Sequence, residues 1–165
     1  MIIFTGFILI FLVYGCGCPY SFTGASVPAH LKKLAIPIVE DRSGSGEPNL
    51  RENLTTLLTR KFVEDNNFTL TDRSKADAVL ECSIISISDA PAVVSAGENV
   101  SARRITISVK VVYRDLVKRN IIFEKTFSNY GDYSPSGGSV QRNSGIQISL
   151  DKISEDILLD TVSGW

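Results

Sequence analysis

The stretch Arg104-Ile105-Thr106-Ile107-Ser108-Val109-Lys110-Val111-Val112-Tyr113 alternates apolar and polar side chains more regularly than any other part of the chain. One face would carry Ile105, Ile107, Val109, Val111 and Tyr113. The other would carry Arg104, Thr106, Ser108, Lys110 and Arg114, with Val112 as the exception. Because successive side chains of a strand point to opposite faces, this pattern predicts a strand with one buried and one polar face.

Further strands are predicted on both sides of this stretch. Residues 115–120 form a turn, and residues 121–127 return as the hairpin partner. Residues 78–88, rich in Val, Ile and Ser, predict a second main strand, and residues 68–70 a short extended piece. A first strand is expected over residues 33–39; because Pro37 has no N–H to donate, this strand lies at an edge or carries a bulge there. Residues 91–100 and 130–139 are expected to be loops.

Two amphipathic helices are predicted from apolar residues at helical spacing. Asn49 and Glu52 have the spacing of an N-cap and its capping-box glutamate. The first apolar stripe contains Leu50, Leu54, Leu57, Leu58 and Phe62, and Asn66-Asn67 ends that helix. The last helix has the stripe Ile146, Leu150, Ile153, Ile157 and Leu158.

The order of these elements predicts an α+β fold. We expect a two-layer sandwich, in which a mostly antiparallel or mixed four-stranded sheet has both amphipathic helices on one face. The other sheet face would be polar and uncovered, and it is either solvated or an interface.

The N-terminal residues have the features of a lipoprotein signal. The apolar run over residues 2–14 is shorter than the roughly 20 residues that cross a bilayer as a helix. Gly15 precedes Cys16, and Val13 lies three residues before the cysteine. We therefore expect a signal peptide over residues 1–15, a tether over residues 16–30 lipidated on Cys16, and one domain over residues 31–165. A plain secretory signal or an uncleaved anchor are the alternatives, and the absence of a basic residue before the apolar run is the departure from a usual signal.

Composition argues against several classes of protein. A net charge of −1 and a pI near 5.8 give no basic field for nucleic acid. The three cysteines form no CxxC pair, and Cys82, inside a predicted strand, is interpreted as a buried apolar residue. The single histidine, His30, leaves few acid–base or metal mechanisms. No enzyme activity, cofactor or metal is expected. The Gly44–Gly46 loop lacks a dinucleotide or Walker pattern and is interpreted as an ordinary loop.

One local excess of basic residues remains. It contains Arg103, Arg104, Lys110 and Arg114, with Lys118 and Arg119 farther along. Either these residues form a solvated strand face and hairpin tip that guards an edge, or Arg103, Arg104, Lys110 and Arg114 bind the phosphates of a glycolipid. The aromatic residues Tyr20, Phe22, Tyr130, Tyr133 and Trp165 belong either to the edge of the core or to an interface.

Several segments together resemble the LptE family of lipopolysaccharide-assembly lipoproteins. The segments are Cys16-Gly17-Cys18-Pro19-Tyr20-Ser21-Phe22-Thr23-Gly24, Lys33-Leu34-Ala35-Ile36-Pro37-Ile38, Ala76-Asp77-Ala78-Val79-Leu80, Glu155-Asp156-Ile157 and Thr161-Val162-Ser163-Gly164-Trp165. The resemblance implies a non-enzymatic protein, lipid-anchored in the outer membrane through Cys16, that faces the periplasm or a barrel lumen. It implies two partners, lipopolysaccharide and the LptD β-barrel, in which the protein acts as plug and assembly factor. The alternative is another small α+β lipoprotein of the curli-secretion, TolB amino-terminal or cell-wall-synthase-activator type.

Overall fold

The computed structural model describes residues 27–94 and 100–163. In chain order its elements are β1 (Lys33–Ala35), β2 (Glu40–Asp41), α2 (Leu50–Asp65), β3 (Thr69–Leu70), the 3-10 turn η1 (Arg73–Lys75), β4 (Ala78–Val94), β5 (Val100–Asp115), β6 (Asn120–Tyr133), the 3-10 turn η2 (Pro135–Gly137) and α3 (Gly138–Ser163). The predicted α+β class is confirmed. The described sheet has six strands where four were predicted, because three short strands lie beside the long ones. The predicted signal peptide, Cys16, Cys18, Tyr20, Phe22 and Trp165 lie outside the described residues.

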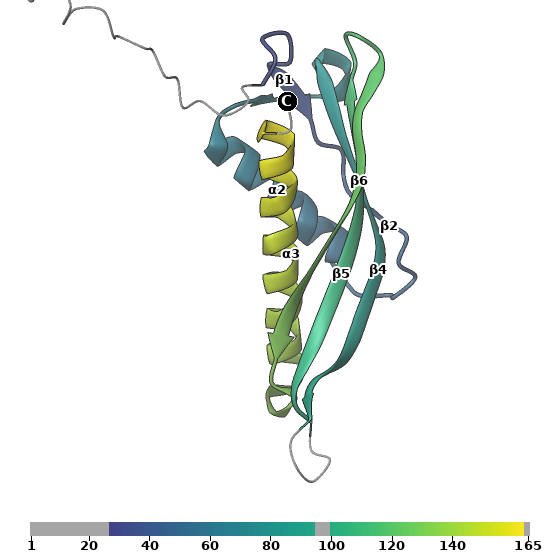
Figure 1. Cartoon of the computed structure of the whole chain (residues 1–165), viewed down its shortest axis with the longest axis vertical. Coiled ribbons are helices and arrows are strands. Elements are labelled where there is room, and N and C mark those ends of the chain that lie inside the picture. Colours follow the sequence, from purple (N-terminus) through teal and green to yellow (C-terminus); the bar gives the residue numbers. More distant parts are fainter. Residues whose placement is uncertain (1–26, 95–99, 164–165) are drawn as a thin grey trace, which may run out of the picture.

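The sheet combines a long antiparallel meander with short parallel strands at one side (Figure 1). Its order is β3-β1-β4-β5-β6, with β2 also paired to β4. The pairs β4–β5 and β5–β6 are antiparallel, whereas β1 pairs parallel with both β3 and β4, and β2 pairs parallel with β4. The sheet is therefore mixed, as expected.

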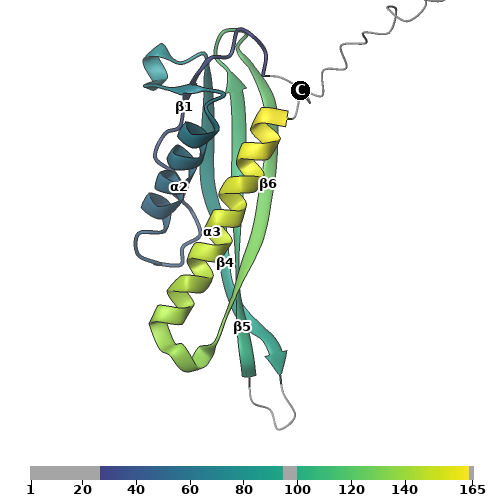
Figure 2. The same cartoon turned by 90° about the vertical axis from the view of Figure 1, so that its left-hand side faces the viewer.

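Both helices pack on the same face of the sheet, as predicted (Figures 1 and 2). The stripe of α2 buries Leu50, Leu54, Leu58 and Phe62, while Leu57 is only partly buried. The stripe of α3 buries Ile146, Leu150, Ile153, Ile157 and Leu158. These two stripes and the apolar rows of the long strands form one hydrophobic core, which includes Cys82 as predicted.

The strand β5 has the alternation read from its sequence. Ile105, Ile107, Val109, Val111 and Tyr113 have no exposed surface, and each such side chain contributes about 2 kcal/mol when it leaves water. Their neighbours Arg104, Lys110 and Arg114 form ion pairs on the opposite, open face, away from the helices. One buried and one polar face are thereby confirmed.

Two predicted loops are partly strand. The strand β4 continues through Pro91 to Val94, and β6 continues through Tyr130 to Tyr133. Both strands extend this far because β5 is long enough to pair with them: Arg103 on β5 pairs with Pro91 on one side and with Tyr133 on the other. Gly and Pro residues in these segments resemble turn signals, but pairing with a long central strand overrides that local preference.

The predicted first strand is split at Pro37. β1 ends at Ala35 and β2 begins at Glu40, so pairing stops around the residue that has no N–H. Of the two alternatives for this strand, the edge position is wrong for β1, which lies between β3 and β4, whereas the interruption at Pro37 agrees with the irregularity expected there.

The predicted capping box at the start of α2 is not formed. Asn49 holds the N-cap position, and its carbonyl accepts the N–H of Asn53 at 2.9 Å. Its backbone is left-handed, with φ 58°, and its side chain makes no cap bond. Glu52 pairs with Arg51 instead. At the other end the helix ends at Asn66, as predicted, and the Asn66 backbone is left-handed.

The outer edge of β6 is covered by α3. Ser149 Oγ donates to the carbonyl of Asn129 at 2.8 Å, and Lys152 Nζ donates to the carbonyl of Tyr130 at 3.0 Å. Gly131 and Gly145 let the two backbones approach so closely that a Cβ on Gly131 would lie 2.0 Å from the Gly145 carbonyl oxygen. This seam therefore holds α3 directly on the edge strand.

The chain enters the described fold beside the β5–β6 turn. His30 Nε2 lies 2.7 Å from Oδ2 of Asp115, and the Lys118 N–H donates to Oδ1 at 2.7 Å. Burial raises the pKa of Asp115, but the hydrogen bonds from Lys118 and His30 outweigh this effect and hold that pKa below its ordinary value. The N-terminal segment is thus attached at the end of the sheet opposite the β4–β5 hairpin (Figure 1).

Candidate functional site

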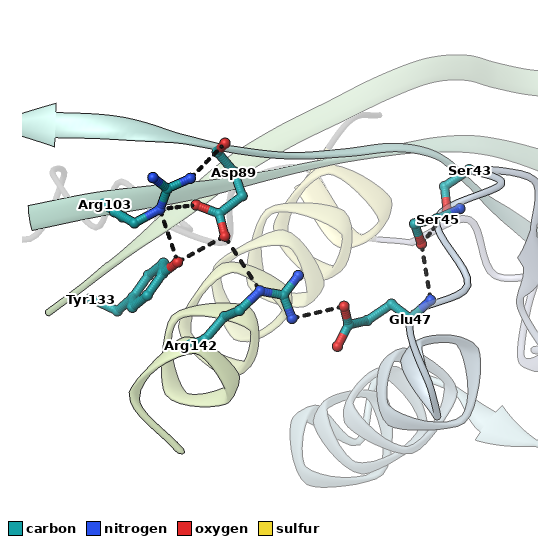
Figure 3. A network of polar contacts seen from close by, with 7 residues as sticks. All are labelled: Ser43, Ser45, Glu47, Asp89, Arg103, Tyr133 and Arg142. Atoms are coloured by element: carbon teal, nitrogen blue, oxygen red, sulfur yellow. Dashed lines mark hydrogen bonds and ion pairs between the residues drawn. The ribbon is translucent and has the colours of Figure 1, made fainter. Parts of the chain in front are cut away.

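A network of polar contacts centred on Asp89 joins the β4–β5 hairpin to β6 and α3 (Figure 3). The Asp89 carboxylate accepts hydrogen bonds from Arg103 Nε at 2.8 Å, Tyr133 Oη at 2.8 Å and Arg142 Nε at 3.3 Å. Arg103 Nη2 also donates to the Asp89 carbonyl at 3.1 Å. Side chains from β4, β5, the end of β6 and the first turns of α3 therefore meet at one carboxylate.

Arg142 extends this network to the loop before α2. Its Nη1 lies 2.8 Å from Oε2 of Glu47, and the Glu47 N–H donates to Ser45 Oγ at 3.2 Å. We call Glu47, Asp89, Arg103, Tyr133 and Arg142 the Asp89 network. Two arginines face two carboxylates, so its formal charges balance.

The Asp89 network is partly shielded from water. Glu47 is 14% exposed, and the side chains of Asp89 and Arg142 are 24% and 33% exposed. Burial raises the pKa of Asp89, but hydrogen bonds from Tyr133 and Arg103 and the charge of Arg103 outweigh it, so this pKa lies below its ordinary value. The hydrogen bond from Arg142 to Glu47 raises the pKa of Arg142. The Asp89 carboxylate and the Arg142 guanidinium are therefore charged at neutral pH.

Both arginines of the network keep free donors. Among the described residues, Arg103 Nη1 and Arg142 Nη2 have no hydrogen-bond partner. Since a guanidinium offers five N–H groups, either arginine can bind an incoming anion without releasing Asp89.

The open sheet face carries a second set of charges, paired across the strands. Arg104 forms a two-bond pair with Asp132 at 2.7 and 2.8 Å, Lys110 lies 2.6 Å from Glu124, and Arg114 lies 3.1 Å from Glu81. A groove of about 370 Å³ opens on the same face. Its lining includes Ile38, Arg42, Arg73, Glu81, Lys110 and Val112.

The four predicted glycolipid-binding residues are thus divided between two faces. Arg104, Lys110 and Arg114 lie on the open face, whereas Arg103 points to the helix side, where it contacts Asp89. Lys118 and Arg119 lie in the β5–β6 turn, at the opposite end of β5 from Arg103. Tyr130 joins the open-face set, because the Arg104 guanidinium lies 3.7 Å from its ring centroid.

In and beside the Gly44–Gly46 loop, backbone amides donate hydrogen bonds to side chains of the same segment. The Ser43 N–H donates to Asp41 Oδ1 at 2.9 Å, and the Ser45 N–H donates to Ser43 Oγ at 3.3 Å. Because local side chains already accept from these amides, the loop matches the ordinary-loop interpretation better than a phosphate cradle.

Sequence reasoning missed most of the Asp89 network. Asp89 lies just after the predicted strand of residues 78–88, Tyr133 was assigned to a loop, and Glu47 and Arg142 were not singled out. One usable signal was Arg142, which precedes the buried Ile146 by four residues and so lies on the same helix face. Contact of Glu47 with a residue 95 positions away follows only from the tertiary fold.

Within residues 27–94 and 100–163, no group of three His, Cys, Asp or Glu residues is placed to hold a metal ion. Neither described helix is long and apolar enough to cross a membrane.

Comparison with known proteins gives one family and a set of similar folds. The family model LptE, described as lipopolysaccharide-assembly, matches residues 31–161. No curated protein matches the chain.

Three solved structures share the fold at low sequence identity. Protein XCC0632 from Xanthomonas campestris has a TM-score of 0.61 and 13% identity, covering 84% of this chain and 91% of that one. Rare lipoprotein B from Shewanella oneidensis has a TM-score of 0.52 and 14% identity, covering 78% and 92%. The PelC dodecamer from Paraburkholderia phytofirmans has a TM-score of 0.53 and 12% identity, covering 85% and 94%. These likenesses show a common fold.

Proposed function

The chain belongs to the LptE family of lipopolysaccharide-assembly proteins, and we propose that it is a non-enzymatic outer-membrane lipoprotein that plugs and helps assemble the LptD β-barrel. In this role it helps the barrel insert lipopolysaccharide into the outer leaflet. The observation that carries the proposal is the family match over residues 31–161, which extends from the start of the sheet into the last turns of α3.

The open sheet face supports a position inside a water-filled barrel. Its cations are paired with carboxylates, as in Arg104–Asp132 and Lys110–Glu124, and Ser108 and Ser128 lie between these pairs. A polar face without a large unpaired charge suits a polar lumen, because neither apolar surface nor bare charge has to be desolvated there.

We propose that a lipid on Cys16 anchors the protein, after removal of residues 1–15, and that residues 16–30 tether the domain of residues 31–165. Metabolic labelling with palmitate tests the anchor. Incorporation is expected in the unchanged chain and not in Cys16→Ser, and a Cys18→Ser control keeps the label. Label retained by Cys16→Ser would refute the assignment.

We propose that Arg103, Arg104, Lys110 and Arg114 contact lipopolysaccharide phosphates. Each of the four is already ion-paired, so phosphate would share or replace a carboxylate partner. The double variant Arg104→Glu/Lys110→Glu is expected to lose binding to purified lipopolysaccharide. The matched double variant Lys118→Glu/Arg119→Glu, in the distant turn, is expected to keep it. Unchanged lipopolysaccharide binding by the Arg104→Glu/Lys110→Glu variant would refute a contribution of the open face to this binding.

A mild-detergent pull-down of the full-length protein from native outer membranes tests the whole proposal. A β-barrel protein of the LptD type is expected to co-elute in stoichiometric amount. A secretion pore, a wall synthase or no stoichiometric partner would refute the barrel role and favour another class of small α+β lipoprotein.

A further inference from the structure

The two outer edges of the long meander differ in how they are protected. On its outer side β4 is paired through Ala78 and Val79 to β1, and through Ser83 and Ile84 to β2. The Arg42 N–H donates to the Ile84 carbonyl at 2.9 Å, which is the last backbone bond on that side within the described part of the chain. From Ile85 to Val94, no described strand pairs with this edge.

The edge of β6 contrasts with that of β4, because α3 covers it. Side chains of Ser149 and Lys152 occupy its carbonyls at Asn129 and Tyr130, and the Gly131–Gly145 contact leaves no room for another strand. An unpaired strand edge is a template for another backbone unless it is blocked. One edge of this sheet is therefore closed, and the other is available.

The available part of β4 is a regular five-residue window, Ser86–Ala90. Register shifts bracket it, one between Ile84 and Ser86 and one between Pro91 and Val93. Inside it the alternation is clean: Ser86, Ser88 and Ala90 are exposed on the open face, while Ile87 packs toward the core.

No charged side chain of this window points to the open face of the sheet. Asp89 carries its one charge, and Arg103 and Arg142 hold that carboxylate on the helix side of the sheet. Native edges are commonly protected by outward lysines. Here the side chains on the open face are two hydroxymethyl groups and a methyl group, so a second backbone can approach to the 4.8 Å spacing of a sheet without steric conflict.

We propose that the Ser86–Ala90 edge of β4 binds an extended segment of the β-barrel partner, which adds a strand to the sheet next to β4. This inference rests on the proposed function for the identity of the partner. The segment belongs to a loop or terminus of that protein, because strands in a closed barrel wall already have both edges paired.

The short length of the window argues against a second copy of this chain as the occupant. Five residues span about 17 Å of one strand edge, and pairing along so short an edge buries only part of the roughly 800 Å² that a stable interface buries on each partner. Edge pairing this short contributes to binding when a larger contact already holds the two proteins together. A barrel that surrounds the domain supplies such a contact, and an isolated pair of β4 edges does not.

Amide hydrogen exchange at single-residue resolution tests this inference, on the lipidated full-length protein alone and in its purified complex with the LptD-type barrel. Along a strand, alternate N–H groups already face β5, and only the others face outward. Complex formation is therefore expected to slow exchange at least tenfold at every second amide of Ser86–Ala90. The Ser88→Lys variant is expected to abolish this protection, whereas Thr59→Lys, on the exposed side of α2, leaves it intact.

Each result separates the two proposals. A complex that forms without alternating protection overturns the edge inference and leaves the barrel role standing. Protection that exists before the barrel is added and grows with protein concentration also overturns it, because the occupant is then a second copy. If no barrel complex forms, the proposed function fails, and the edge inference fails with it.

Discussion

A single methyl group on Gly131 is expected to destabilise the fold strongly, because it would fall inside the backbone of α3. The added Cβ would lie 2.0 Å from the Gly145 carbonyl oxygen and 2.8 Å from its carbonyl carbon. Gly131 is not in a left-handed conformation, so the cost arises from this contact and not from backbone strain. The clash is with backbone, so no side-chain rotation relieves it, and α3 must move away from β6.

The size of this effect follows from what the seam contains. Overpacking of a tight contact costs about 1–3 kcal/mol. Moving α3 away from β6 also weakens the Ser149–Asn129 and Lys152–Tyr130 hydrogen bonds, each of which contributes about 1 kcal/mol to stability. Gly131→Ala is therefore expected to lose about 3 kcal/mol of unfolding free energy, which corresponds to a melting temperature about 6–12 °C lower for a domain of this size.

Gly145→Ala provides the matched control. Its Cβ would lie 3.3 Å from both the Gly131 carbonyl oxygen and Cδ1 of Tyr133, so a shift of a few tenths of an ångström suffices. Alanine also favours a helix over glycine by about 1 kcal/mol. Urea denaturation followed by circular dichroism should place Gly145→Ala within about 1 kcal/mol of the unchanged chain. Equal stabilities for the two variants would refute the close approach of β6 and α3.

Three further outcomes are expected. Arg142→Ala leaves the largely buried Glu47 carboxylate without its cation and removes one donor to Asp89, so urea denaturation should show about 1–2 kcal/mol less unfolding free energy. The control Arg60→Ala, whose ion pairs are exposed and long, should stay within about 0.5 kcal/mol of the unchanged chain. The pKa of Asp89 is depressed in the folded state, so its contribution to stability is complete above the unfolded-state pKa near 4 and is lost as pH falls through the folded-state pKa. The urea midpoint of the unchanged chain should therefore fall between pH 5 and pH 3, and Asp89→Asn should reduce that fall. An unaltered pH profile in Asp89→Asn would contradict this. Burial raises the pKa of Cys82 to about 12, so a thiol reagent at pH 8 should leave Cys82 unmodified in the folded chain and modify it in urea; rapid modification without denaturant would show that Cys82 is accessible.

Sequence periodicity predicted the layers of this fold because those layers depend on one-dimensional patterns. The alternation from Ile105 to Tyr113 and the stripes beginning at Leu50 and Ile146 record which side chains leave water, and the structure buries them. The ends of β4 and β6 were missed because Pro91 and Gly131 have local preferences for turns, which pairing with β5 overrides.

The Asp89 network could not be assembled from the sequence for a related reason. Its five members come from five separate segments, and ionic contacts leave no periodic signal of the kind that burial does. Arg103 was singled out for its charge, but its separation from Arg104 into opposite faces follows from strand parity, which also puts Arg103 beside Asp89. Charge in a linear sequence identified candidate residues without showing their carboxylate partners.

The contact between His30 and Asp115 fixes the end of the sheet at which the chain enters the fold. Arg103, in the Asp89 network, and Asp115 are twelve residues apart on the same strand, a distance of roughly 40 Å. The sheet therefore separates the Asp89 network by its length from the place where the chain enters the described fold, so the two polar contacts lie at opposite ends of one continuous strand.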